Sequence, residues 1–437
     1  MKFPEDYINT ILQGDSFERI KEIPENSVDL LVTDPPYGYS FMGKSWDKAL
    51  PSVDIWKECL RVLKPGAFAF IMSAPRSDVL SRMIVRIEDA GFRVNFSPIY
   101  WTYASGFPKA MNIGKMVDKR MGKERTRSKN NNKINLSNIG PAGYKEEAIS
   151  EEAISEEAKL LNGSYGGFQP KPAVEVIIVA MKPLSEKTFV DQALKNGKGV
   201  TWFDDGRIPI TDNADLAREN LLDNGNFGIG NNNNNAQQRK ENGLPPVGRF
   251  PANLLVSDDV LNDGRIRVTG GGDKGNKQPK ANNTQVPANP NAGTFQLNTG
   301  SYSRYFDLDA WAKTLPFLIV PKASKGEKDA GLEAFEERQI VSMATANGTS
   351  GKPSSITEGR NTRRANHHPT VKPLKLMSYL ITLGSRTDDI VLDPFAGSGT
   401  TPLAAHFLKR KYIGIEREKE YCDIAQGRLK QRQEVLL

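Results

Sequence analysis

A short motif near the start of the chain carries residue types that could hold an amine. Asp34-Pro35-Pro36-Tyr37 directly follows the apolar run 28–33. The two prolines fix the backbone, so the Asp34 carboxylate and the Pro35 carbonyl oxygen can point at one spot. Two acceptors beside the flat ring of Tyr37 suit a planar ligand with an exocyclic amino group. The motif predicts such a site; the alternative is a proline-stiffened turn with a packed tyrosine.

A second motif near the end of the chain could bind an adenosine-type ligand. The segment 393–399, Asp-Pro-Phe-Ala-Gly-Ser-Gly, lies between a predicted strand and a predicted helix, and Glu416 follows Asp393 by 23 residues, at the end of the next strand. Gly397 and Gly399 allow close backbone approach, and the helix start offers free N–H groups. An acid in this place binds ribose hydroxyls in dinucleotide folds. The alternative is a tight turn followed by a surface acid.

The glycine pattern also indicates which cofactor to expect. It is shorter than Gly-x-Gly-x-x-Gly, and no Gly-Lys-Ser/Thr follows it. Both facts disfavour a pyrophosphate cradle and a Walker loop. A cofactor with a ribose and no phosphate fits better, and S-adenosyl-L-methionine is the candidate.

The elements that must position these motifs alternate between strand and helix. Apolar runs predict strands, and helical spacing separates them. This rhythm implies a mostly parallel sheet with helices on its faces. The predicted strands are 28–33, 67–72, 92–100, 174–181, 390–392 and 412–415, and the predicted helices are 53–63, 77–90, 373–383, 400–408 and 420–433.

The middle of the chain has a different composition. The run 109–133 holds nine basic and two acidic residues, and a Glu-Glu-Ala-Ile-Ser repeat follows at 146–155. We expect a flexible basic and acidic insert over about 119–165, with the repeat forming a solvated helix or tether. The Asn-rich and Gly-rich stretches at 231–235 and 270–300 cannot bury enough apolar surface to order themselves alone.

Composition excludes several classes of protein. The chain has 437 residues, a formal net charge of +7 and no apolar run long enough to span a bilayer. Two cysteines, Cys59 and Cys422, make no disulfide framework, and three histidines make a metal site unexpected. We therefore expect a cytoplasmic protein without a membrane segment or a metal, whose mild positive charge permits a polyanionic partner.

Taken together, the two motifs make the chain resemble the beta class of S-adenosylmethionine-dependent DNA amino-methyltransferases, in which the catalytic motif precedes the cofactor motif. The resemblance implies a circularly permuted Rossmann-like α/β sheet of seven, mostly parallel strands with a large inserted target-recognition region. The segments that also resemble this family are Gln13-Gly14-Asp15, Lys171–Val176, Met181–Pro183, His368–Pro373 and Tyr412–Glu416, while Arg249–Asn253 and Pro321–Ser324 resemble a phage and prophage branch.

The resemblance implies site-specific methylation of adenine N6 in double-stranded DNA by base flipping and direct transfer. It divides the chain into a first catalytic part (1–183), a target-recognition region (184–365) and a second catalytic part (366–437). It assigns catalysis to Asp34, Pro35, Pro36 and Tyr37, and the cofactor to Asp15, Lys372, Pro373, Asp393, Pro394, Phe395, Gly397, Ser398, Gly399, Thr400 and Glu416. Candidate DNA contacts are Lys109, Lys115, Arg249, Arg304 and Lys322. A homodimer, a cognate restriction endonuclease and a bacterial or phage-infected cytoplasm fit the same resemblance.

Several alternatives stay open at this point. Cytosine N4 is the other amine that this family methylates, and Asp34 in place of Ser favours adenine. A catalytically silent DNA-binding relative is disfavoured by the intact Asp34, Tyr37 and Glu416, and a methyltransferase acting on protein or RNA by the motif order. Methylation of cytosine C5 needs a cysteine directly after proline, which neither Cys59 nor Cys422 is.

Overall fold

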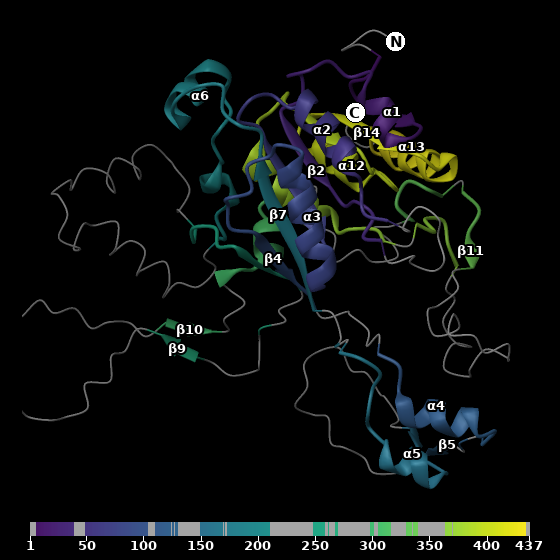
Figure 1. Ribbon diagram of the computed structural model, residues 1–437. Coiled ribbons are helices and arrows are strands. Elements are labelled where there is room, and N and C mark those ends of the chain that lie inside the picture. Colours follow the sequence, from purple (N-terminus) through teal and green to yellow (C-terminus); the bar gives the residue numbers. More distant parts are fainter. Residues whose placement is uncertain are drawn as a thin grey trace, which may run out of the picture.

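The structure is a computed structural model (Figure 1). It describes residues 6–38, 49–103, 110–123, 125, 127–129, 149–168, 170, 173–209, 248–257, 261, 267–269, 298–300, 305–315, 329–333, 335–339, 363–368 and 370–433. No helix among these residues has both the length and the apolar character needed to cross a membrane.

One eight-stranded sheet organises the chain, and β7 is its antiparallel member. Its order is β1 (Thr10–Gln13), β14 (Lys411–Glu416), β13 (Ile390–Asp393), β2 (Leu30–Thr33), β3 (Phe68–Ser73), β7 (Val174–Met181), β4 (Ile99–Thr102) and β8 (Leu254–Val256). The predicted mostly parallel α/β sheet is confirmed. The predicted count of seven strands is wrong, because β8 from the inserted region pairs with β4 as an additional parallel edge strand.

The two ends of the chain meet in the middle of this sheet. β2 pairs in parallel with β13, with Leu30 opposite Val391 and Leu31 opposite Leu392. β1 pairs with β14 farther out. The carboxyl ends of β2 and β13 are therefore neighbours, and the chain leaves both strands at the same edge of the sheet.

Helices cover both faces of the sheet, which explains its continuous apolar strands. Along β2, Leu30 and Val32 face one core while Leu31 faces the other, as the two-residue period of a strand requires. The helices α1 (Ser16–Ile20), α2 (Val53–Val62) and α3 (Ser77–Asp89) pack on the Leu31 side, and α9 (Leu308–Ala312), α11 (Leu374–Gly384), α12 (Thr400–Phe407) and α13 (Lys419–Gln433) contribute to the opposite core. Figure 1 shows α2 and α3 in front of the strands.

One predicted strand is wrong over most of its length. The sequence predicts a strand over 92–100, whereas β4 begins at Ile99. Pro98 has no N–H group for a ladder, so the regular pairing starts only after it. Before it, Phe92 packs into the core and Arg93 makes one isolated bridge to Met181.

Described parts of the 184–365 region pack on the eight-stranded sheet. Besides β8 and α9 they include α6 (Phe189–Asn196) and the short helix η3 (Phe203–Gly206). Trp311 of α9 is buried with its ring edge-on to Tyr379, 4.9 Å between centroids, and its indole N–H donates to the Asp205 carbonyl. These contacts join the region to α11. The described region also holds two small two-stranded antiparallel sheets: β9 (Arg267–Thr269) with β10 (Asn298–Gly300), and β11 (Arg338–Gln339) with β12 (Arg363–Arg364).

An arm leaves the sheet between β4 and β7. Its described elements are α4 (Ile113–Arg120), β5 (Arg127–Lys129), β6 (Ile149–Glu151) and α5 (Glu156–Leu160), and Figure 1 shows them apart from the sheet. Asp118 is buried between the two helices, where it accepts hydrogen bonds from the backbone N–H groups of Ile154 and Ser155 and pairs with Arg125. Of the solvated helix or tether expected over the acidic repeat, the helix is wrong for residues 149–155: Ile149–Glu151 form β6, and residues 152–155 have no regular structure before α5 begins.

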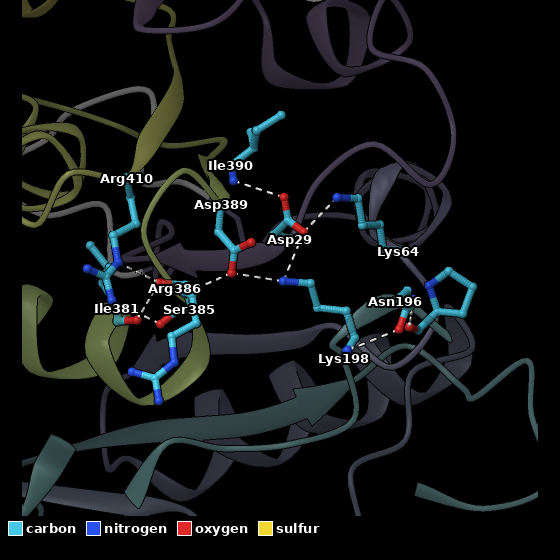
Figure 2. Close-up of polar contacts among 11 residues, drawn as sticks. Asp29, Lys64, Asn196, Lys198, Ile381, Ser385, Arg386, Asp389, Ile390 and Arg410 are labelled. Atoms are coloured by element: carbon cyan, nitrogen blue, oxygen red, sulfur yellow. Dashed lines mark hydrogen bonds and ion pairs between the residues drawn. The ribbon is translucent and has the colours of Figure 1, made fainter. Parts of the chain in front are cut away.

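A buried ion network ties four segments together at the amino end of β2 (Figure 2). The Lys198 ammonium lies 2.9 Å from both Asp29 and Asp389, and Lys64 pairs with Asp29 at 2.7 Å. Asp29 also accepts the Ile390 backbone N–H. Although burial opposes its ionisation, the Lys198 charge and these hydrogen bonds lower the pKa of Asp29. The network therefore holds β2, β13 and the segments after α2 and α6 in one arrangement.

We predict that Lys198→Met lowers the free energy of unfolding by about 3 kcal/mol, because it leaves two carboxylates near a site built for their cation. Lys195→Met is the matched control: Lys195 is more than half exposed and pairs with Glu186 at the surface. Its loss should cost less than about 0.5 kcal/mol. Urea unfolding at pH 7 measures both, and equal effects would contradict the structural role of the network.

Candidate active site

The two sequence motifs open into one cavity of about 1220 Å³ at the carboxyl edge of the sheet. Asp34 follows β2 and Asp393 ends β13, and the two strands are neighbours. The Thr33 hydroxyl donates to Asp393 Oδ1 at 2.6 Å, which joins the ends of these strands directly. Ligands in open α/β sheets bind outside the carboxyl ends of the strands, so the cavity lies where a ligand is expected.

Asp34 already has a donor on each carboxylate oxygen. The Tyr37 hydroxyl donates to Oδ1 at 2.6 Å, and the Lys372 ammonium lies 2.8 Å from Oδ2. Burial first, and then the charges of Asp34 and Glu175, raise the pKa of Tyr37 well above its ordinary value. Tyr37 is therefore a neutral donor at physiological pH, and Asp34 is an oriented acceptor.

Lys372 has a second acidic partner, Glu175 of β7, at 3.0 Å. The sequence assigns Lys372 to the cofactor; the structure places its ammonium between two carboxylates of the cavity. Burial alone would favour the neutral amine, but the charges of Asp34 and Glu175 raise the pKa of Lys372 above its ordinary value. Lys372 therefore remains a cation throughout the physiological range.

Asp393 is a buried carboxyl group at the centre of the site. Its Oδ1 accepts the Thr33 hydroxyl and, at 3.1 Å, the backbone N–H of Phe395. Burial raises the pKa of Asp393 to about 6, and the hydrogen bonds from Thr33 and Thr401 oppose this shift only in part. Its first task is thus structural, since it fixes the start of the glycine turn against β2.

The glycine turn has the backbone conformation that its residue types predict. Gly397 and Gly399 have φ of +52° and +77°. A Cβ on Gly397 would lie 2.8 Å from His368, and one on Gly399 would lie 2.8 Å from Ala425, so a side chain fits at neither position. The Glu416 carboxylate accepts the backbone N–H groups of Gly397 and Glu418, and burial raises its pKa.

A buried arginine supports the far side of this turn. Arg428 of α13 is 1% exposed, and its guanidinium donates to the Ser398 carbonyl oxygen at 2.6 Å and to the Thr400 hydroxyl at 3.2 Å. On the near side, the Ser16 hydroxyl donates to the Pro394 carbonyl oxygen, and Asp15 caps α1. The turn is therefore held from two helices and from the end of β14.

Most of the predicted site residues lie on the cavity wall. Among the predicted catalytic and cofactor residues, two do not line the cavity: Pro373 is the cap residue before α11, and Gly399 is the cap residue before α12. The predicted residues that line the cavity are Asp15, Asp34, Pro35, Pro36, Tyr37, Lys372, Asp393, Pro394, Phe395, Gly397, Ser398, Thr400 and Glu416.

The two candidate DNA contacts that the structure describes do not line this cavity. Lys115 is exposed on α4, and the Arg249 guanidinium lies 4.9 Å from the centroid of the Tyr305 ring. Lys109, Arg304 and Lys322 lie outside the described residues.

Several groups of the site belong to neither sequence motif. Glu175 and Tyr103 face the Lys372 charge, Thr33 bonds Asp393, and Arg428 supports the turn. A charged residue inside the apolar strand 174–181 is the one local signal that points to Glu175. The others become visible only when distant segments are brought together.

Neither thiol takes part in this site. Cys59 and Cys422 are buried, and burial raises the pKa of both, that of Cys422 to about 12. Within the part of the chain that the structure describes, no cluster of His, Cys, Asp and Glu could hold a metal ion. The chemistry that the site supports is acceptor-based orientation of an amine beside a glycine turn.

Comparisons with known proteins point to one family. A family model described as DNA methylase, of the N6/N4 methyltransferase type, matches residues 28–427. Type II methyltransferase M2.MboI of Moraxella bovis is 51% identical over 61 residues, 14% of this chain and 22% of the relative. Orphan methyltransferase M.BamHII of Bacillus amyloliquefaciens is 56% identical over 63 residues, 14% of this chain and 24% of the relative. The chain thus spans under a quarter of the length of these curated relatives.

Some solved structures also have some similarity to this chain. The PvuII DNA methyltransferase, titled cytosine-N4-specific, has a TM-score of 0.40 and 15% identity over 97% of this chain and 88% of that one. M1.HpyAVI in complex with SAM has a TM-score of 0.37 and 16% identity over 96% of this chain and 98% of that one.

We predict that Asp393→Asn removes a pH-dependent loss of stability. The folded-state pKa of about 6 lies above the unfolded value of 3.8, so the penalty is absent below pH 4 and grows as pH rises through 6. Relative to wild type, the variant should gain about 3 kcal/mol between pH 4 and pH 7.5. Urea unfolding across this range, with the exposed Asp54→Asn as the matched control, measures the gain. A difference in unfolding free energy between Asp393→Asn and wild type that does not change with pH would refute this prediction.

Proposed function

The chain belongs to the N6/N4 DNA methylase family, and on that basis we propose that it is a site-specific DNA methyltransferase. It transfers a methyl group from S-adenosyl-L-methionine to the N6 amine of adenine in double-stranded DNA. The observation that carries this proposal is the single cavity that holds both the Asp34 carboxylate and the Gly397 turn. Methyl transfer requires the two reactants to meet within one site.

The residues present fit S-adenosylmethionine. The Glu416 carboxylate uses two of its acceptor positions for backbone N–H groups and lines the cavity, which leaves capacity for ribose hydroxyls. A Cβ at Gly397 would collide with His368, so the turn presents bare backbone there. Asp15, Phe395 and Glu416 would hold the nucleoside part. When bound, the cofactor supplies a methyl group on a sulfonium, and net transfer forms a nitrogen–carbon bond, breaks a sulfur–carbon bond and releases one proton from the amine.

The residues after β2 would receive the target base. An exocyclic amine is a weak nucleophile because its lone pair is delocalised into the ring. Hydrogen bonds from the amine to Asp34 and to the Pro35 carbonyl oxygen would fix its orientation and localise that lone pair. The base must leave the duplex to reach them, and Tyr37 offers a ring on which it can stack.

The choice of adenine over cytosine as the target base rests on the residue type at position 34. In the family that the chain resembles, Asp at this position goes mostly with adenine and Ser mostly with cytosine. Cytosine N4 methylation and silent DNA binding are the other outcomes of the test below.

We predict N6-methyladenine at one recurring sequence in the genomic DNA of cells that express this chain. Sequencing with detection of modified bases identifies both the base and its sequence context. Asp34→Ala should lower methylation at least 1000-fold, because the amine loses its main acceptor, while binding of labelled cofactor changes less than about threefold. Asp54→Ala, on the exposed surface of α2, should methylate as the wild type does.

Detection of modified cytosine at that sequence would change the proposed target base from adenine to cytosine. Cofactor binding without modification of any DNA would support a silent relative, and full activity of Asp34→Ala would remove the catalytic assignment.

We further propose that the arm between β4 and β7 contacts the DNA backbone. The arm joins the sheet at Tyr103 and Ala173, where the Tyr103 backbone N–H donates to the Ala173 carbonyl oxygen. Both residues line the cavity. The arm therefore starts where the target base must enter. Exposed basic residues gather on and after α4: Lys115, Lys119, Arg120 and Lys123. Exposed apolar residues stand beside them: Met116, Met121, Leu160, Tyr165 and Phe168. Such a mixture suits phosphates and unstacked bases.

Changing Lys115, Lys119 and Arg120 together to Gln should weaken DNA binding and reduce the slope of log affinity against log salt by up to about 3. Fluorescence anisotropy with a labelled duplex at several salt concentrations measures the slope. The control carries Lys21, Lys57 and Arg82 changed to Gln on α1, α2 and α3 and should retain the wild-type slope. Equal slopes in both variants would place the DNA elsewhere.

The remaining parts of the proposal follow from the family resemblance. They are an adenine-specific enzyme of a phage or prophage branch, acting in the cytoplasm of a bacterium or of a phage-infected host, alone or as a homodimer, with a cognate restriction endonuclease as a further partner. Arg249 is a second candidate for DNA contact.

A further inference from the structure

Three charged side chains from distant segments meet in the cavity. Asp34 follows β2, Glu175 belongs to β7, and Lys372 precedes α11. Their side chains are 16%, 18% and 10% exposed. Burial of three charges is costly unless they are paired, so their arrangement is a built feature of the site.

Lys372 is shared between the two acids. Its ammonium lies 2.8 Å from Asp34 Oδ2 and 3.0 Å from Glu175 Oε2, so the two carboxylates are no more than about 6 Å apart. At this distance two carboxylates without a cation repel each other strongly enough that one of them retains a proton at higher pH. Lys372 places a positive charge between the two carboxylates and offsets this repulsion.

Glu175 limits what Lys372 does to Asp34. A cation bound by Asp34 alone would withdraw charge from the oxygens that must accept the amine. With Glu175 present, the three groups together carry one negative charge, and Asp34 keeps acceptor strength for a third donor beside Tyr37 and Lys372.

We propose that Lys372 and Glu175 are positioning residues for Asp34. Lys372 fixes its orientation and offsets its repulsion with Glu175, and Glu175 preserves its strength as an acceptor for the target amine. This inference rests on the proposed function and concerns the same cavity. It gives a role to Glu175, the charged residue inside the apolar strand β7.

The other titratable groups near Asp34, Glu175 and Lys372 do not mask the pH dependence that these three residues would produce. Burial raises the pKa of Tyr103 to about 12, and the pKa of Tyr37 is also raised, so neither titrates below pH 9. Asp393, which faces Asp34 from β13, titrates near pH 6. Because it is present in every variant below, its contribution is common to all of them.

The test compares single-turnover methylation rates between pH 5.5 and 9, with saturating cofactor and duplex DNA. In Lys372→Met we expect the methylation rate on the plateau of the pH profile to fall at least tenfold. The acid limb, where the rate drops as the pH falls, should move up by about one pH unit, because Asp34 and Glu175 then share a proton. In Lys372→Met/Glu175→Gln the acid limb returns to its wild-type position, since one carboxylate is gone. Glu175→Gln alone lowers the plateau about tenfold without raising the acid limb.

Two controls separate positioning from folding. Lys372→Arg keeps the cation and should keep the acid limb of the wild type. Lys375→Met removes a buried lysine of α11 that pairs with Asp309, outside the cavity, and should leave the limb unmoved even if stability falls. Calorimetric binding of the cofactor, within threefold of wild type, shows that each variant is folded.

The possible failures are distinct. A wild-type acid limb in Lys372→Met, or a double variant whose limb stays with that of Lys372→Met, would overturn the positioning role alone. A folded wild-type chain that binds the cofactor and methylates no DNA would overturn the proposed function, and this inference with it.

Discussion

The pairing of β2 with β13 is the constraint on which the site depends. These strands come from opposite ends of the chain, and their parallel register brings the end of β2 beside the end of β13. The Thr33–Asp393 hydrogen bond closes the junction at 2.6 Å. Without this pairing, an acceptor for an amine and a turn for a cofactor would be separate loops. With it, they are two walls of one cavity.

Buried charge is handled in similar ways at the two edges of the sheet. At the amino edge, Lys198 lies between Asp29 and Asp389 and fixes the start of β2 against β13. At the carboxyl edge, Lys372 lies between Asp34 and Glu175. Each is one cation shared by two acids from different segments. The first group does not line the cavity and serves the fold, whereas the second faces the cavity and can serve a ligand.

The inserted segments are placed by the same sheet. The arm begins after β4 and returns into β7 at the edge that bears the cavity, while β8 and α9 extend the sheet and cover its α11 face. The base of the arm, at Tyr103 and Ala173, lines the cavity, and neither residue belongs to the buried core.

The sequence alone determined the local elements and the two motifs, because the period of apolar residues and the prolines and glycines act within a few neighbouring residues. Strand 174–181 and the turn at Gly397 follow from such signals. The tertiary structure alone decided that Lys372 meets Asp34, that Glu175 meets Lys372, and that Arg428 supports Ser398. These contacts join residues from 30 to more than 300 positions apart, and pairing at such separation depends on strand order and register, which no local pattern encodes.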